Sequence, residues 1–200
     1  MKKVKKTSSE RALSIIKSPI MTEKSTNLNQ FNKKVEAIVN FSDVPDKPIR
    51  IMQLSLTDTS GDIRNQFDYQ EAVVINMLLH LRESNRGYRS SIRVLDSFGH
   101  MIFAPFDSDF SESALSNLVP GQYKYQVTIP NKLLKPGLYS TIVIVDKAKG
   151  EGKQVDRHDS VLTFEITDTT TKCGTEGHGY NNLAIVAPEL KWKLISLDHK

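Results

Sequence analysis

The 200-residue chain lacks the features by which several large classes of protein are recognised. It has a single cysteine, Cys173, which excludes an intramolecular disulfide framework and is typical of a reducing compartment. No stretch approaches the roughly 20 apolar residues that a membrane-spanning helix needs. No apolar signal-peptide core follows the charged N-terminus MKKVKKTSSE. We therefore expect a cytoplasmic protein.

Basic residues are scarce beyond the first quarter of the chain. Residues 1–50 contain 11 Lys/Arg against 5 Asp/Glu, a net charge of +6, whereas residues 51–200 contain 16 against 18, a net charge of −2. The larger part therefore has no basic excess with which to bind nucleic acid generally. The early lysines are expected to form a solubilising tail, with contact to phosphate groups of RNA or anionic lipid as the alternative.

Motifs for catalysis, cofactors and metals are also missing. The chain has no GxxxxGK[ST] phosphate loop and no G-x-S-x-G nucleophile elbow. Asp107 and Asp109 lack the longer acidic run and the bend glycine of a calcium loop, and Cys173 with His178 offers fewer ligands than zinc requires. We therefore expect no enzymatic activity, no cofactor and no metal, with glycoside processing by Asp107 or Asp109 as an alternative.

From Arg50 onward the chain is a succession of short strand patterns. IRIMQLSLTD alternates apolar and polar residues, and AVVINMLLHL is a nearly continuous apolar run with a Val-Val-Ile core. YKYQVTIP and VLTFEITD also alternate, and turn signals such as TSGD, SFGH and KPG separate the strands. About seven or eight strands with almost no helix predict an all-β fold, an antiparallel β-sandwich of jelly-roll or immunoglobulin-like type.

The sequence divides into two parts. Residues 1–47 form a short basic N-terminal extension, expected to be partly helical or disordered, and residues 48–200 form the sandwich. Within the sandwich, the Gly-rich residues 168–182 are predicted to be a flexible hinge and residues 183–196 to be the final strand. A hinge before a terminal strand is the physical requirement for exchange of that strand between two copies.

Several phrases of the sandwich follow one another in a specific order. They are IRIMQLSLTDTSG, AVVINMLLHL, SSIRVLDSFGHMIFAPFDSDF, GQYKYQVTIPNKLLKPGLYSTIVIVD, HDSVLTFEITD and AIVAPELKW. Through them, residues from about 50 to 194 resemble the C-terminal polysaccharide-binding domain of the ATP-binding subunit of polysaccharide ABC exporters, the Wzt type. The resemblance implies a non-catalytic jelly-roll-like sandwich that recognises the end of a lipid-linked O-antigen chain in the cytoplasm.

The same resemblance implies partners. The family's domain is a homodimer whose last strand crosses to the partner, and the corresponding segment here is Leu183–Ser196. In the exporter subunit the ATPase lies upstream of this domain, whereas the present chain has no phosphate loop and cannot power transport by itself. The expected partners are therefore a polysaccharide and the ATPase or permease of an ABC transporter, which would hold the chain at the inner face of the membrane.

The opening segment carries a second resemblance. ALSIIKSPIMTEKSTNLNQFNKKV, at residues 12–35, is similar to the start of the bacterial large-subunit ribosomal protein at the peptide-exit tunnel. About 25 residues without partner strands cannot bury a core of their own. A fusion, a misjoined reading frame and a coincidental match of a basic linker all explain the similarity. The alternative function is a ribosome-associated protein that binds ribosomal RNA through this segment.

Sugar recognition needs flat apolar rings that stack on C–H groups and planar polar groups that bond to hydroxyls. Residues of these types lie on or near the ends of the expected strands. The candidates for carbohydrate binding are Arg93, Asp96, His100, Tyr123, Tyr125, Tyr139, Asp146 and His158. A structural interpretation stays open for them, because alternating tyrosines of a sandwich commonly face the core and Asp96 and Asp146 can cap turns.

Overall fold

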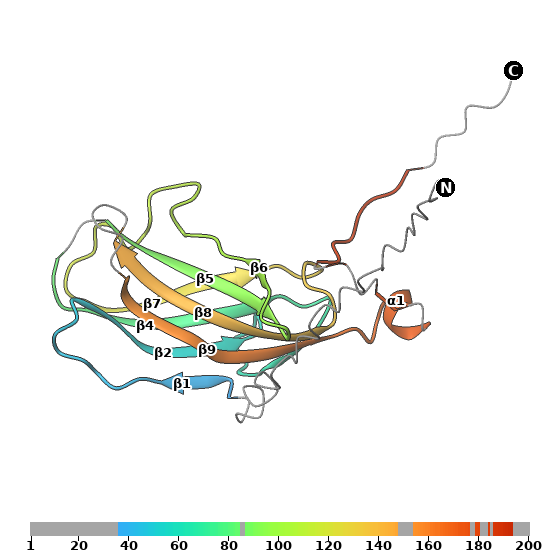
Figure 1. Ribbon diagram of the computed structural model, residues 1–200, viewed down its shortest axis with the longest axis horizontal. Coiled ribbons are helices and arrows are strands. Elements are labelled where there is room, and N and C mark those ends of the chain that lie inside the picture. The colour runs from blue at the N-terminus through green and yellow to red at the C-terminus, as the bar shows by residue number, and fades with distance from the viewer. Residues whose placement is uncertain are drawn as a thin grey trace, which may run out of the picture.

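Two β-sheets lie face to face in the computed structural model and form a sandwich (Figure 1). The structure describes residues 36–84, 87–147, 154–176, 179–180, 184 and 186–193. Sheet A contains, in spatial order, β1 (Ile38–Asn40), β2 (Ile49–Thr57), β4 (Val73–Leu81) and β7 (Gly121–Ile129). Sheet B contains β3 (Gln66–Asp68), β9 (Gln154–Thr167), β8 (Gly137–Lys147), β5 (Tyr88–Asp96) and β6 (Met101–Phe103). The predicted β-sandwich is confirmed.

The strands pair almost entirely in antiparallel fashion. Among the described strands the exception is β3, which runs parallel to β9 at one edge of sheet B. The apolar run AVVINMLLHL forms the central strand β4, so its interpretation as a strand is confirmed. No helix in the described part of the chain is long and apolar enough to cross a membrane.

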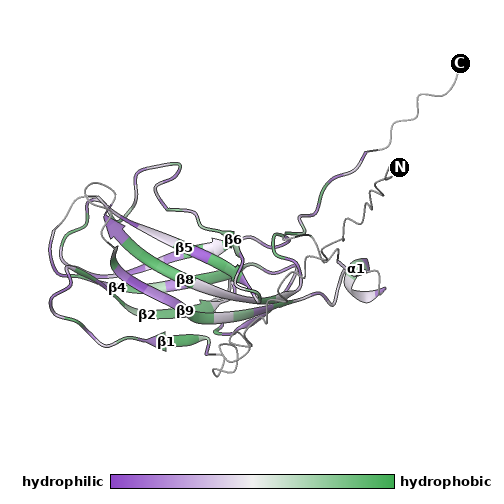
Figure 2. Ribbon diagram, in the orientation of Figure 1, coloured by the Kyte–Doolittle hydropathy of each residue, from purple (hydrophilic) through white to green (hydrophobic). Residues whose placement is uncertain are grey.

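The position of a strand in its sheet explains its hydrophobic pattern. β8 lies between β9 and β5, and its residues from Tyr139 to Asp146 are buried on both faces, which fits a sequence that is hydrophobic over most of its length (Figure 2). β7 is an edge strand, and its burial alternates residue by residue. Tyr123, Tyr125 and Val127 pack against the core, whereas the polar residues between them face outward.

The hydrophobic core lies between the two sheets. Phe164 of β9 stacks on Tyr139 of β8 with a centroid distance of 5.6 Å and meets the edge of Phe67 at 6.3 Å. The other large, fully buried side chains come from both sheets: Ile49, Ile51, Leu54, Leu56, Ile75, Met77, Leu79, Leu81 and Tyr88. Burial of such a side chain contributes about 1.5–3 kcal/mol to folding, so this cluster fixes the sandwich that positions the surface sites.

The start of the sandwich lies earlier than residue 48. β1 (Ile38–Asn40) pairs with residues 53–55 of β2 and is part of sheet A. Residues 1–35, which carry the lysine-rich tail and the ribosomal-protein resemblance, lie outside the described residues.

The C-terminal region differs in form from the expected hinge and strand. Residues 168–182 include the single-turn helix α1 (Lys172–Thr175), and the hydroxyl of Tyr180 donates to Asp168 Oδ2 at 2.6 Å. In the predicted final strand, the described residues form one bridge, between Val186 and Leu134. Pro188 lies two residues after Val186 and has no N–H to continue a ladder.

Candidate functional site

A pocket of about 660 Å³ opens at the end of the sandwich where β5 ends and β8 begins. The strand register places Asp96 opposite Tyr139. The flanking segments Asp96–His100 and Lys135–Gly137 supply most of the wall. The pocket is lined by Asp96, Ser97, Phe98, His100, Lys135, Pro136, Gly137, Leu138, Tyr139 and Ala184. It thus brings together three residues that the sequence analysis selected: Asp96, His100 and Tyr139.

The carboxylate of Asp96 organises the first of these turns. It accepts hydrogen bonds from the backbone N–H groups of Phe98 at 2.9 Å and His100 at 2.8 Å, and its Oδ2 lies 3.1 Å from His100 Nδ1. Gly99 permits the turn because its φ of +82° is strained for a residue with a side chain. Burial opposes ionisation, but the hydrogen bonds from His100 and Phe98 outweigh it and lower the pKa of Asp96.

Phe98 presents an aromatic face at the mouth of the pocket. The residue is 78% exposed, and the centroid of its ring lies 6.0 Å from that of His100. A flat phenyl ring beside an imidazole and a carboxylate combines an apolar surface with hydrogen-bonding groups. Such an arrangement suits a ligand that has both C–H faces and hydroxyl groups.

Tyr139 lines the pocket and connects its wall to the hydrophobic core. Its hydroxyl donates to the carbonyl of Lys135 at 2.8 Å, while its ring stacks on Phe164. Burial, together with the negative charge of Asp96, raises the pKa of Tyr139 to about 12. The phenol is therefore neutral at physiological pH, and it shapes the pocket without adding charge.

Arg93 and Asp146 lie outside the pocket, on the outer face of sheet B. We use this name for the side of β5, β8 and β9 that points away from sheet A. Asp146 bonds to Arg89, with Arg89 Nε donating to Asp146 Oδ1 at 2.7 Å. Arg93 lies on the same face of β5, opposite Ile142 of β8.

Tyr123 and Tyr125 point into the sandwich. The hydroxyl of Tyr123 donates to the carbonyl of Val119 at 2.7 Å, and that of Tyr125 donates to Asp107 Oδ2 at 2.6 Å. Burial and the Asp107 carboxylate raise the pKa of Tyr125 above its ordinary value. The rings pack against the core, as the structural interpretation of alternating tyrosines expects.

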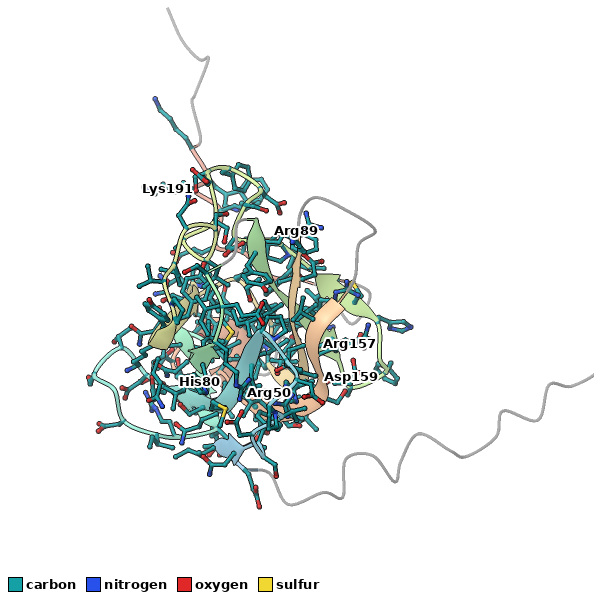
Figure 3. The ribbon with its side chains drawn as sticks, turned by 90° about the vertical axis from the view of Figure 1, so that its left-hand side faces the viewer. Arg50, His80, Arg89, Arg157, Asp159 and Lys191 are labelled. Atoms are coloured by element: carbon teal, nitrogen blue, oxygen red, sulfur yellow. The ribbon has the colours of Figure 1, made fainter. Side chains whose placement is uncertain are left out.

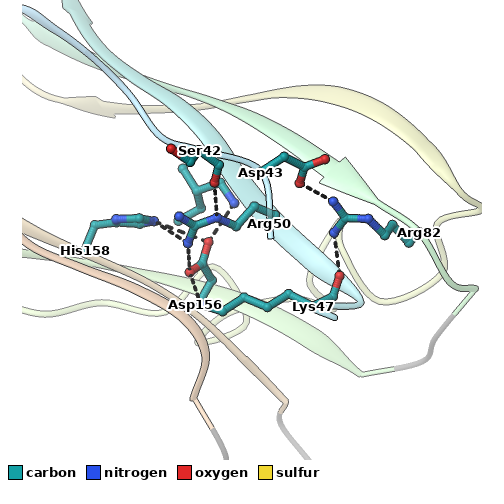
Figure 4. A network of polar contacts seen from close by, with 8 residues as sticks. Ser42, Asp43, Lys47, Arg50, Arg82, Asp156 and His158 are labelled. Atoms are coloured by element: carbon teal, nitrogen blue, oxygen red, sulfur yellow. Dashed lines mark hydrogen bonds and ion pairs between the residues drawn. The ribbon is translucent and has the colours of Figure 1, made fainter. Parts of the chain in front are cut away.

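His158 of β9 lies in a buried polar network that reaches Arg50 of β2 (Figure 4). Its Nε2 is 3.3 Å from Asp156 Oδ2, and Phe41 stacks on its ring at a centroid distance of 3.7 Å. Asp156 also accepts hydrogen bonds from Arg50 at 2.5 Å and from Lys47 at 2.8 Å. These contacts join β2 to β9, so the network holds the two sheets together.

Sequence reasoning missed Phe98 and Lys135, which line the pocket with the three selected residues. Both lie in segments identified only as turns, SFGH and LLKPGLY. The available signal was the phenylalanine itself, because an aromatic residue in a short turn between two strands has no core to enter.

The fold and the pocket define a β-sandwich domain with an open recess at one end of its strands. Described as the Wzt C-terminal domain, a family model matches residues 45–183, and the chain belongs to this family. Its members are non-catalytic carbohydrate-binding domains of polysaccharide ABC exporters. The crystal structure of the C-terminal domain of Wzt is similar in fold, with a TM-score of 0.58 and 12% identity over 76% of this chain and 85% of that chain. No curated protein sequence matches the chain.

Proposed function

We propose that the chain recognises a cell-surface polysaccharide of the O-antigen kind and serves an ABC export or glycan assembly system. The pocket at the ends of β5 and β8 is the proposed site for a sugar unit, with Phe98 stacking on the ring and Asp96 and His100 bonding to hydroxyls. The observation that carries this proposal is the exposed Phe98 ring beside the paired Asp96 and His100. The partner ATPase or permease would hold the chain in the cytoplasm, at the inner face of the membrane.

Replacing Phe98 with alanine is expected to weaken glycan binding about threefold to tenfold, the usual contribution of an aromatic contact. Because the side chain is exposed, the fold should be unaffected. Binding is measured on an array of bacterial surface polysaccharides and then by calorimetric titration of the glycan that binds wild type.

Phe110 provides a matched control, since it is a fully exposed phenylalanine outside the pocket. The Phe110→Ala variant should bind like wild type. Equal binding by the Phe98→Ala variant would move the site away from this pocket, and absence of any glycan bound by wild type would refute the proposed function.

We also propose a homodimer formed by exchange of the C-terminal segment. An apolar groove of about 500 Å³ lies between the edge strands β6 and β7, with Ile92, Ile102, Phe103, Val127, Ile129 and Leu133 in its wall. Val186 lines the same groove, and the N–H of Ala187 donates to the carbonyl of Leu133 at 3.2 Å. Beyond this anchor, the described segment leaves the sandwich (Figure 1).

Two large apolar residues on this segment support a second copy as the occupant of the groove. Leu190 is 61% exposed and Trp192 is 90% exposed. Burial of both in the groove of a partner would remove this apolar surface from water. The double variant Leu190→Ser/Trp192→Ser should raise the dimer dissociation constant at least about 30-fold, as measured by size-exclusion chromatography with light scattering. A wild-type chain that is monomeric at micromolar concentration would contradict this proposal.

A further inference from the structure

The outer face of sheet B has an apolar centre that is unusual for a surface strand. Ile142 is 8% exposed and Ile144 is 1% exposed, although neither belongs to the core cluster between the sheets. In the strand register, Arg93 lies opposite Ile142 and Ser91 lies opposite Ile144. The centre of this face is therefore two isoleucines beside one cation and one hydroxyl.

Two ion pairs flank this centre, and each is self-contained. Arg89 pairs with Asp146 at 2.7 Å, and Arg157 pairs with Asp159 at 2.7 Å. Figure 3 places Arg89, Arg157 and Asp159 on the same side of the molecule, away from His80 of sheet A. Because these charges cancel in pairs, they leave no carboxylate for a further cation.

Arg93 is the cation that remains. Within the described residues it makes no hydrogen bond and no ion pair, and its Nε is buried without an acceptor. The hydroxyl of Ser91, a residue that is 1% exposed, is also buried without a partner. Two such orphaned groups on one face of one strand, about 7 Å apart along it, are rare because buried polar groups are nearly always bonded.

The chemistry of these groups defines the missing partner. A guanidinium donates hydrogen bonds, accepts none and keeps its charge at any physiological pH. An anion compensates both its charge and its unused donors, whereas a neutral hydroxyl compensates only the donors. The neighbouring carboxylates of Asp146 and Asp159 are occupied by their own arginines.

We propose that the outer face of sheet B binds an acidic substituent of the polysaccharide, a sugar carboxylate or a phosphate. Arg93 bonds to the anion, and the buried side chains of Ser91 and Ile142 lie beside it on the same face. This inference rests on the proposed function. Arg93 precedes Asp96 by three residues, about 10 Å along the strand, so a glycan whose end occupies the pocket can continue across this face.

The test uses the full chain and pairs of bacterial surface polysaccharides. Each acidic glycan is offered in its native form and after carboxyl reduction or removal of phosphate, which also distinguishes the two anions. Wild type should bind a native acidic glycan about tenfold to hundredfold more tightly than its neutralised form, the range for a charge-assisted hydrogen bond. The Arg93→Gln variant should lose this difference, and Arg93→Lys should retain part of it.

Lys124→Gln is the matched control, because it removes one exposed positive charge from β7 of sheet A. This variant should discriminate between the two glycan forms as wild type does. Thermal unfolding checks that each variant is folded. If Arg93→Gln is not folded, Arg93→Lys replaces it in the comparison. Equal binding of native and neutralised glycans by wild type, or unchanged discrimination by Arg93→Gln, would overturn the inference while leaving the proposed function intact. Failure of wild type to bind any glycan would overturn both.

Discussion

Replacement of Asp156 by alanine is expected to lower the free energy of unfolding by about 3–5 kcal/mol, the range for removing one partner of a buried ion pair. Asp156 is 1% exposed, and its carboxylate accepts hydrogen bonds from Arg50, from Lys47 and from the backbone N–H of Ile51 (Figure 4). Alanine would remove the acceptor of the Ile51 N–H and the carboxylate partner of the Arg50 guanidinium. The guanidinium would keep its contacts to the Ser42 carbonyl and to His158. Lys47 contributes less to the loss because it reaches solvent.

Urea-induced unfolding followed by far-UV circular dichroism measures this effect. Asp159→Ala is the matched control, since Asp159 is exposed and pairs with Arg157 on the surface. The control should cost less than about 1 kcal/mol. A loss below about 1.5 kcal/mol for Asp156→Ala would show that water replaces the carboxylate in the network.

The difference in unfolding free energy between wild type and Asp156→Ala should also depend on pH, which gives a second test with the same variant. Burial alone would raise the pKa of Asp156, but hydrogen bonds from His158, Lys47 and the Ile51 N–H hold it well below its ordinary range. Because the folded pKa is depressed, the unfolded state takes up the proton first as the pH falls. The stabilisation is therefore fully present above the unfolded pKa of about 3.9 and is lost as the pH falls through the folded pKa. The difference in unfolding free energy between wild type and Asp156→Ala should therefore become smaller at low pH.

Replacement of Phe164 by alanine is expected to lower the free energy of unfolding by about 3–5 kcal/mol, because it opens a cavity in the centre of the core. The ring is fully buried, stacks on Tyr139 and meets the edge of Phe67. Tyr139 lines the pocket, so the loss of its stacking partner should also weaken glycan binding. Chemical unfolding measures the first effect and calorimetric titration measures the second.

Phe164→Leu should lower the free energy of unfolding less than Phe164→Ala does, because leucine leaves a smaller cavity. Phe110→Ala should be neutral, since the Phe110 ring is exposed. A loss below about 1.5 kcal/mol for Phe164→Ala would mean that the two sheets move together and fill the space.

The sequence was sufficient for the strands and insufficient for the sites, and the tyrosines of β7 show why. Alternation predicts that Tyr123 and Tyr125 share one face, because strand geometry is local. Which face meets the other sheet depends on the packing of the whole sandwich, and the local pattern is the same in both cases. Asp96, His100 and Tyr139 were selected as separate candidates, and no local pattern indicates that they share a pocket. Asp96 and Tyr139 lie opposite each other only through the register of β5 with β8.

The network around Asp156 could not be predicted from the sequence for the same reason. Asp156 and Arg50 are 106 residues apart, and no local pattern relates them. His158 and Asp159 are neighbours in the sequence, yet His158 is buried and Asp159 is exposed. The bulge of β9 beside β8 and the topology of the sheets assign these positions.

The open edges of the two sheets bear on how copies of this chain can associate. β1, β3 and β6 have three residues each, so long rows of backbone groups lie open on β7, which has nine residues, and on β9, which β3 covers only at residues 165–167. Growth into an open fibre by strand pairing needs two such edges on every molecule. The exposed charges of Lys124 on β7 and of Arg157 and Asp159 on β9 lie at these edges, where they oppose pairing with a further copy.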